Sequence, residues 1–250
     1  MPRLRCHWAL LGRARATLLG DPPPTSSLLR DHRAEYFAGG VAPDALRLLA
    51  GADKRSTHFY DDRRRETWDA VIATVAECHP EVADPRNLTP AAQAWMAGYL
   101  AHIATDLAYW HNVLPFLPPF PEQSEAHHGA WLIADDCAIA TADRFLDPTH
   151  VDYGGAPPWV DVEAVRRMLV RLQERILVDG MWPVELAYYR ARPEAAERAD
   201  ADLLAEQLSG WESNLAQARE LIPDGAWPAF RTDAERRACK IVRAYLAPVT

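Results

Sequence analysis

The strongest constraint on the fold is the apolar segment at residues 89–113, TPAAQAWMAGYLAHIATDLAYWHNV. Its apolar residues recur with the 3.6-residue period of an α-helix. Thr89 followed by Pro90 is typical of a helix start, where a hydroxyl caps free amides and proline fits the first helical position. Because so few of its side chains are polar, this helix is expected to be buried on most faces. Three potential metal ligands interrupt it, His102, Asp106 and His111.

Helical periodicity also dominates the rest of the chain. Strand signals are nearly absent, since no alternating Val/Ile/Thr run precedes an Asn-Gly or Asp-Gly turn. Asp161 is positioned to cap one helix, and the segments 114–123 and 146–159 are predicted loops. We predict an all-α fold with helices near residues 5–20, 25–38, 64–79, 89–113, 125–146, 161–179, 183–193, 197–220 and 232–247.

The distribution of histidines indicates how the chain is organised. A length of 250 residues allows one large domain with a substantial core. All 9 histidines lie in the first 150 residues. We therefore expect a single all-α domain spanning 1–250, with a metal-bearing N-terminal part at 1–146 and a helical scaffold or lid at 160–247.

Composition and charge argue against several classes of protein. The net charge is −8 and the arginines are scattered among acids, whereas a nucleic-acid-binding protein usually presents a basic face. No apolar stretch is long enough to span a membrane, and Arg13 and Arg15 break the N-terminal segment after about seven apolar residues, which is short for a secretion signal. The cysteines form no CxxC pair. We expect a cytoplasmic protein with free thiols, no nucleic-acid partner and no membrane span.

His102 and Asp106 stand four residues apart, so their side chains share one face of the predicted helix. An imidazole and a carboxylate at this spacing can supply two ligands to a divalent cation. A buried aspartate is otherwise costly unless it is paired. The alternative is an Asp–His hydrogen bond in an ordinary core, and this pair alone does not separate the two interpretations.

Three further residues are candidate ligands, and each has an ordinary alternative. Asp44 follows GGVAP, which we interpret as a turn, and it would otherwise cap a helix starting at Ala45. His58 lies in STHFYDD and would otherwise be a loop histidine. His7 lies on an amphipathic segment beside Trp8 and would otherwise be a half-buried surface histidine. Only their combination with the helical pair is informative.

In that combination the chain resembles the zinc-dependent phospholipase C family, which is related in fold to the single-strand-specific zinc nucleases. The resemblance rests on RCHWAL with His7, GGVAPDA with Asp44, THF with His58, and GYLAHIATD with His102 and Asp106. His111, shortly after the helical pair, fits it too. It covers roughly residues 1–130. It implies a single multi-helix domain with a metal cluster in the helical core.

The resemblance also implies how up to three zinc ions would be held, although iron or manganese suit the same ligand types. The residues that would hold the first ion are Asp44, His58, His102 and Asp106. Asp106 would bridge to a second ion shared with His7, and His111 with either His127 or His128 would hold a third. The family has a glutamate one helical turn after its last histidine, where this chain has Trp131 and Leu132; Asp135 or Asp136 would substitute only with altered geometry. One, two or three ions therefore remain open.

A two-metal centre bridged by Asp106 favours attack of an activated water on a phosphodiester or a related small ester. Asp44 and Asp106 are the residues expected to act in catalysis, and the expected partner is a small-molecule or lipid-like substrate. Two alternatives stay open. The same centre can serve as a Lewis acid in a biosynthetic cyclisation, elimination or dehydration, or the chain is a helical metal-binding protein without catalysis.

Overall fold

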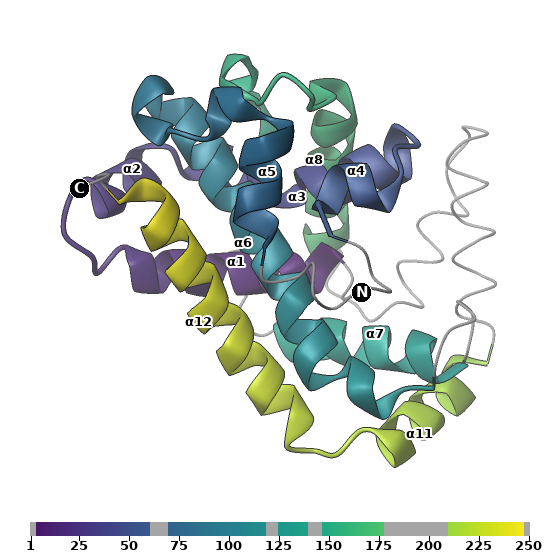
Figure 1. Ribbon diagram of the computed structural model, residues 1–250. Coiled ribbons are helices and arrows are strands. Elements are labelled where there is room, and N and C mark those ends of the chain that lie inside the picture. Colours follow the sequence, from purple (N-terminus) through teal and green to yellow (C-terminus); the bar gives the residue numbers. More distant parts are fainter. Residues whose placement is uncertain (1–3, 61–69, 119–124, 140–146, 178–209, 248–250) are drawn as a thin grey trace.

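The computed structural model describes residues 4–60, 70–118, 125–139, 147–177 and 210–247, with the side chains at 135–139 and 173–177 left outside the description. Within these ranges every regular element is helical, which confirms the predicted all-α fold (Figure 1). The α-helices are α1 (Leu4–Leu18), α2 (Thr25–Asp31), α3 (Arg33–Leu49), α4 (Lys54–His58), α5 (Val71–Cys78), α6 (Pro90–Asn112), α7 (Glu125–Ile139), α8 (Val162–Leu177), α11 (Trp211–Leu221) and α12 (Ala226–Leu246). The short 3-10 helices are η2 (Pro80–Val82), η3 (Pro85–Asn87), η4 (Leu114–Phe116), η5 (Pro148–His150) and η6 (Tyr153–Gly155).

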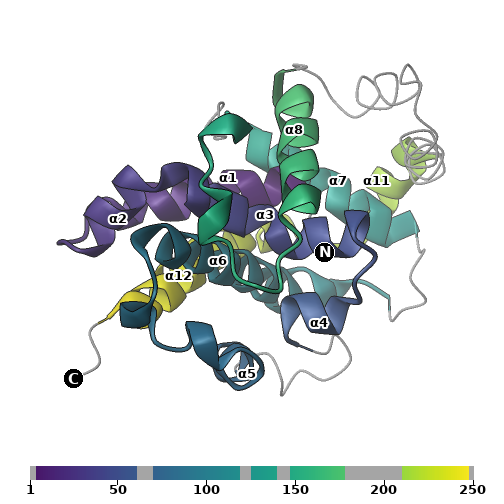
Figure 2. The same cartoon turned by 90° about the horizontal axis from the view of Figure 1, so that it is seen from above.

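The central element is α6, the long helix predicted from the apolar segment. The hydroxyl of Thr89 accepts a hydrogen bond from the amide of Ala92, and Pro90 opens the first turn, so the predicted start is confirmed. All side chains from Ala94 to Trp110 are buried. Helices α3 and α12 pack along α6, while α1 contacts α12, α7 and α3 (Figures 1 and 2). Polar groups on α6 are therefore enclosed by other helices.

Two glycines allow α3 and α6 to approach closely. A Cβ atom added at Gly39 would lie 1.9 Å from the carbonyl oxygen of Trp95, and one added at Gly98 would lie 1.8 Å from that of Tyr36. Both distances are far below van der Waals contact, so the crossing requires residues without side chains. The adjacent Gly40 faces α1, where an added Cβ would lie 2.3 Å from the side chain of Leu11.

The interpretation of GGVAPDA as a turn is wrong, because the whole segment lies inside α3. Asp44 consequently does not cap a helix that begins at Ala45. The predicted helix 25–38 is instead two helices, α2 and α3, which meet at His32. Pro43 lies within α3 and cannot donate the usual backbone hydrogen bond there. Burial of α3 between α1, α6 and α8 compensates for this loss (Figure 2).

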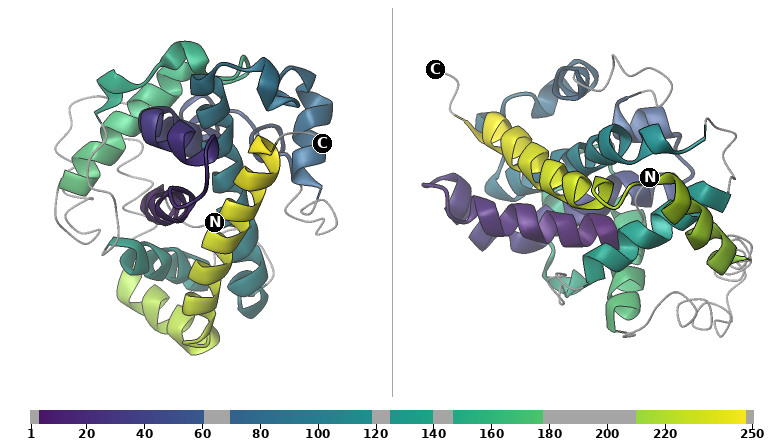
Figure 3. Two further views of the ribbon diagram at one scale, coloured as in Figure 1. Left: turned by 90° about the vertical axis from the view of Figure 1, so that its left-hand side faces the viewer. Right: turned by 90° about the horizontal axis from the view of Figure 1, so that it is seen from below.

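At the other end of the molecule α7 and α11 lie side by side (Figures 1 and 3). They also meet at a glycine, since a Cβ atom at Gly129 would lie 1.9 Å from the carbonyl oxygen of Asn214. The predicted cap of α8 is confirmed, because Asp161 Oδ1 accepts from the amides of Glu163 and Ala164. The predicted helix 183–193 and the start of the one at 197–220 lie outside the described residues.

Two further expectations concern the described residues as a whole. No helix among them combines the length and the apolar character needed to cross a membrane. Cys6, Cys78 and Cys239 are free cysteines, as expected. The division into a metal-bearing part and a scaffold or lid stays a prediction, although α12 from the second part packs directly on α6.

Candidate metal centre

Five side chains with ligand chemistry converge where α1, α3, α4 and α6 meet. His7 comes from α1, Asp44 from α3 and His58 from the last position of α4, while α6 contributes both His102 and Asp106. All are buried, with Asp44 exposed by 4% and the others fully enclosed. Ligand atoms lie within 4.8 Å of one another in two overlapping groups, His7–Asp44–His102 and His58–His102–Asp106.

The glycines of the helix crossing explain why these residues meet. Positions four apart on a helix share a face. His102 follows Gly98 by four residues and Asp106 follows it by eight, so both lie on the face that approaches α3. Asp44 likewise follows Gly40 by four, on the face toward α1 and therefore toward His7. Each close backbone approach thus places a ligand one turn further along the helix.

The carboxylate of Asp106 lies between two imidazoles. Its Oδ1 is 3.2 Å from Nε2 of His7, and its Oδ2 is 3.5 Å from Nε2 of His58. Asp44 approaches the same ring, with 3.7 Å between its Oδ1 and Nε2 of His58. Within the described structure Oδ1 of Asp106 and Nε2 of each facing histidine nevertheless have no hydrogen-bond partner.

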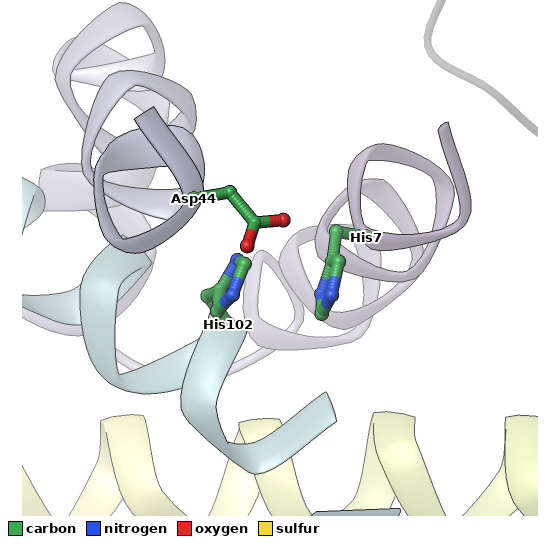
Figure 4. A group of neighbouring side chains, drawn as sticks. All are labelled: His7, Asp44 and His102. Atoms are coloured by element: carbon green, nitrogen blue, oxygen red, sulfur yellow. The ribbon is translucent and has the colours of Figure 1, made fainter. Parts of the chain in front are cut away.

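The rings of His7 and His102 stack, with centroids 3.8 Å apart and planes inclined by 11°. Figure 4 shows the carboxylate of Asp44 leaning over the space between these two rings, with each residue on a different helix. Nε2 of His102 also has no hydrogen-bond partner within the described structure. Nitrogen and oxygen atoms of three helices therefore face one small buried volume.

Backbone and hydroxyl groups fix which nitrogen of each ring faces the cluster. Nδ1 of His102 donates to the carbonyl oxygen of Gly40 at 2.8 Å. Nδ1 of His58 lies 2.8 Å from the hydroxyl of Thr57, which itself donates to the carbonyl oxygen of Asp53. Since these partners hold the Nδ1 protons, Nε2 of both rings presents its lone pair to the carboxylates. Such outer hydrogen bonds are typical of histidines that bind metal ions.

The histidines and the aspartate of the cluster have the protonation states that bind a cation. Burial lowers the pKa of His58 to about 3 and that of His102 to about 4, because the charged imidazolium is disfavoured away from water. Burial alone would raise the pKa of Asp106, but the imidazoles around it, His7 foremost, hold that pKa well below its ordinary value. Neutral imidazoles beside an ionised carboxylate are the forms that bind a divalent ion. A buried carboxylate with an unpartnered oxygen is otherwise unfavourable, so the donor set fits a metal ion.

The three remaining predicted ligands lie elsewhere. His111 is exposed at the end of α6, beside a surface groove that is also lined by Asp233 and Arg237 of α12. His127 is buried, and its Nε2 donates to the carbonyl oxygen of Pro118 at 2.9 Å. The ring of His128 packs against Trp131, with centroids 5.2 Å apart.

Among the described side chains, no group with metal-ligand spacing includes His111, His127 or His128. The side chains of Asp135 and Asp136 lie outside the described part of the structure. A third ion at these residues therefore stays a prediction. The structure brings together the residues expected for the first two ions.

Sequence reasoning missed Tyr60 as a partner of the cluster. Its buried hydroxyl donates to Oδ2 of Asp106 at 2.8 Å. It also missed the contact between the hydroxyl of Thr57 and Nδ1 of His58. The only available signal was the position of both residues within two of His58 in THFY. That spacing does not reveal which side chains turn toward α6.

Comparisons with known proteins agree with this geometry. Residues 6–154 match the family model described as zinc-dependent phospholipase C, and this span is more than half of the chain. The matched span contains all five residues of the cluster. No curated protein and no solved structure matches the chain.

Proposed function

The chain belongs to the zinc-dependent phospholipase C family, and we propose that it is a zinc-dependent hydrolase that cleaves a phosphodiester or a related small ester. Family membership supports both zinc and a hydrolase. The observation that carries the proposal is the meeting of His7, Asp44, His58, His102 and Asp106 in the helical core. Within the described structure Nε2 of all three histidines and Oδ1 of Asp106 have no hydrogen-bond partner there. Such a donor set has no evident structural purpose without a cation.

A divalent cation held here would activate a water molecule and stabilise negative charge on a phosphate or ester oxygen. Asp44, His58, His102 and Asp106 would hold one ion, and Asp106 together with His7 would hold a second. Asp44 is the only one of the five with measurable exposure. It is therefore the acid best placed to accept a proton from water entering the centre.

The enclosure and charge of the protein favour a narrow, small-molecule or lipid-like substrate. The ligand side chains are covered by α1, α3, α4 and α6, so the reacting group must extend into the helical core. A net charge of −8 disfavours polyanionic nucleic acid. A single phosphodiester or ester on a slender substrate meets both conditions.

Elemental analysis of the purified protein, combined with hydrolysis of bis(p-nitrophenyl) phosphate, tests the proposal. We expect bound zinc and zinc-dependent release of nitrophenol, both lost in Asp106→Asn. Tyr245→Phe is the control, because this buried tyrosine lies outside every predicted ligand set, donates to the carbonyl oxygen of Val82, and should retain zinc and activity. A protein without zinc would contradict the metal centre. Zinc without hydrolysis of phosphodiesters or carboxylic esters would favour the Lewis-acid biosynthetic alternative.

A further inference from the structure

We propose that Tyr60 is a positioning residue of the metal centre. Its hydroxyl fixes the orientation of the Asp106 carboxylate, so that one oxygen serves the His58 side of the cluster and the other serves the His7 side. The inference rests on the proposed metal centre. It assigns to Tyr60 the control of how this single carboxylate is shared between two positions.

The contacts of Asp106 carry the first step. Tyr60 is exposed by only 2%, and its hydroxyl donates to Oδ2 at 2.8 Å. The same oxygen lies 3.5 Å from Nε2 of His58, whereas Oδ1 lies 3.2 Å from Nε2 of His7. A carboxylate is free to rotate about its Cβ–Cγ bond unless a hydrogen bond holds it. The phenol is the described hydrogen-bond donor that selects which oxygen faces His58.

The backbone before Tyr60 explains how two neighbouring side chains reach the same cluster. Helix α4 ends at His58, and Phe59 follows in the left-handed region with φ of 57°. A residue other than glycine adopts this conformation only where its surroundings impose it. Phe59 is buried, with its ring edge-on to Trp159 and to His79. With Phe59 held in this conformation, both His58 and Tyr60 reach Asp106 on α6.

The ammonium of Lys54 lies over the ring of the same tyrosine. Its ammonium lies 5.2 Å from the ring centroid of Tyr60 and 4.9 Å from that of Trp110, one turn beyond Asp106 on α6. A cation over a phenol draws π-electron density toward itself. That withdrawal strengthens the hydroxyl as a donor. Lys54, Tyr60 and Asp106 therefore form a directed series of contacts that ends at the cluster.

Zinc titration of the chelator-treated full-length protein tests this role without relying on activity. Residues that orient metal ligands typically change metal affinity about 10- to 100-fold, and we expect Tyr60→Phe to weaken zinc binding by that factor. The matched control is Tyr245→Phe, since Tyr245 is also buried and donates to the carbonyl oxygen of Val82 at 2.9 Å, away from the cluster. Its zinc affinity should equal that of the wild type. Equal affinity in Tyr60→Phe and the wild type would overturn the inference.

A double-mutant comparison separates positioning from a general structural effect. If Tyr60 acts through Asp106, then adding Tyr60→Phe to Asp106→Glu, which keeps a carboxylate for zinc but displaces it from the phenol, should cause no further loss of zinc affinity. A further loss as large as that of Tyr60→Phe alone would overturn the inference. Should Tyr60→Phe fail to fold, a crystal structure of the zinc-bound wild type decides. We expect the Tyr60 hydroxyl to donate to a carboxylate oxygen of Asp106 there, and a zinc-bound Asp106 without that hydrogen bond would overturn the inference.

The wild-type titration distinguishes this inference from the proposed function. A wild-type protein that takes up no zinc would contradict both. A wild-type protein that binds zinc, together with a Tyr60→Phe variant that binds it equally well, would contradict only the role of Tyr60.

Discussion

Two helix crossings in this molecule are both packed at glycines, but they surround different kinds of side chains. α3 and α6 meet at Gly39 and Gly98, and α7 and α11 meet at Gly129. The first crossing surrounds a cluster of ligand atoms that face one another. The second lies beside His127 and His128, which are engaged by the carbonyl of Pro118 and the ring of Trp131.

The difference lies in the spacing between glycine and histidine. On α6, His102 and Asp106 follow Gly98 by four and eight residues, so they continue along the face that meets α3. On α7, the two histidines precede Gly129 by two residues and by one, which places them on other faces. A close crossing therefore creates a site only when ligands repeat with the helical period from the point of contact.

The largest expected effect comes from filling the two crossings. Gly98→Ala and Gly129→Ala each place a Cβ atom within 2 Å of a backbone oxygen, so each should lower the free energy of unfolding by about 3 kcal/mol or more. Denaturant unfolding measures this loss. Zinc analysis of the remaining folded protein should then separate the variants.

We expect Gly98→Ala to lose zinc, because it displaces α6 from α3, and Gly129→Ala to retain it. Equal zinc retention in the two variants would contradict the link between the first crossing and the cluster.

Removing a ligand at the first crossing should weaken metal binding without adding atoms to the helix crossing. His102→Ala and Asp106→Ala each delete a proposed ligand, so zinc affinity should fall by more than about 100-fold, beyond the effect of removing an outer hydrogen bond. Because zinc binds the folded state, both variants should also lose the increase in melting temperature that added zinc gives the wild type. Full zinc content in both variants would refute their assignment as ligands. His32→Ala is the histidine control, because His32 lies beside Glu35 and outside every predicted ligand set, and it should keep the zinc-dependent increase.

The fold class and the central helix could be predicted because their signals are local. The apolar period, the Thr89 cap and Pro90 all lie within residues 89–113, and the structure confirms them. The segment GGVAPDA was misinterpreted because glycine and proline also mark turns. Its helical state depends on packing of Gly39 against α6 and of Gly40 against α1, contacts that are distant in sequence.

The sequence predicted which residues form the candidate site, but it did not predict how they contact one another. The resemblance to the zinc-dependent phospholipase C family indicated His7, Asp44, His58, His102 and Asp106, and the structure brings these five together. It also indicated His111 with His127 or His128, which form no such group among the described side chains. The hydrogen bond of Tyr60 depends on the left-handed backbone of its predecessor, which no propensity of phenylalanine predicts. The spacing of His127 from Gly129 differs from that of His102 from Gly98, but it is informative only once the two helix crossings are known.

Acid should destabilise the zinc-free protein through the first crossing. In the unfolded chain histidine takes up a proton below pH 6.5, whereas the pKa values of His58 and His102 in the folded chain are about 3 and 4. The unfolded state therefore binds more protons as the pH falls from 6.5 toward 4, and stability decreases by about 1.4 kcal/mol per pH unit for each imidazole. Denaturant unfolding of zinc-free protein between pH 7 and pH 4.5 measures the slope. His58→Gln should reduce the slope by about 1.4 kcal/mol per pH unit, and an unchanged slope would contradict the buried neutral state.

The smallest expected effect tests whether the site depends on the crossing rather than on the intrinsic stability of α6. Thr89→Ala removes the hydroxyl that caps the amide of Ala92, three turns before His102, and should lower the free energy of unfolding by about 1 kcal/mol. Zinc affinity should stay at the wild-type level, because Gly98 and the packing of α3 hold the ligand-bearing part of the helix in place. Thr89→Ser, which keeps the hydroxyl, is the matched control. Weaker zinc binding in Thr89→Ala than in Thr89→Ser would show that the cluster is held by the helix as a whole, and the contrast between the two crossings would lose its explanation.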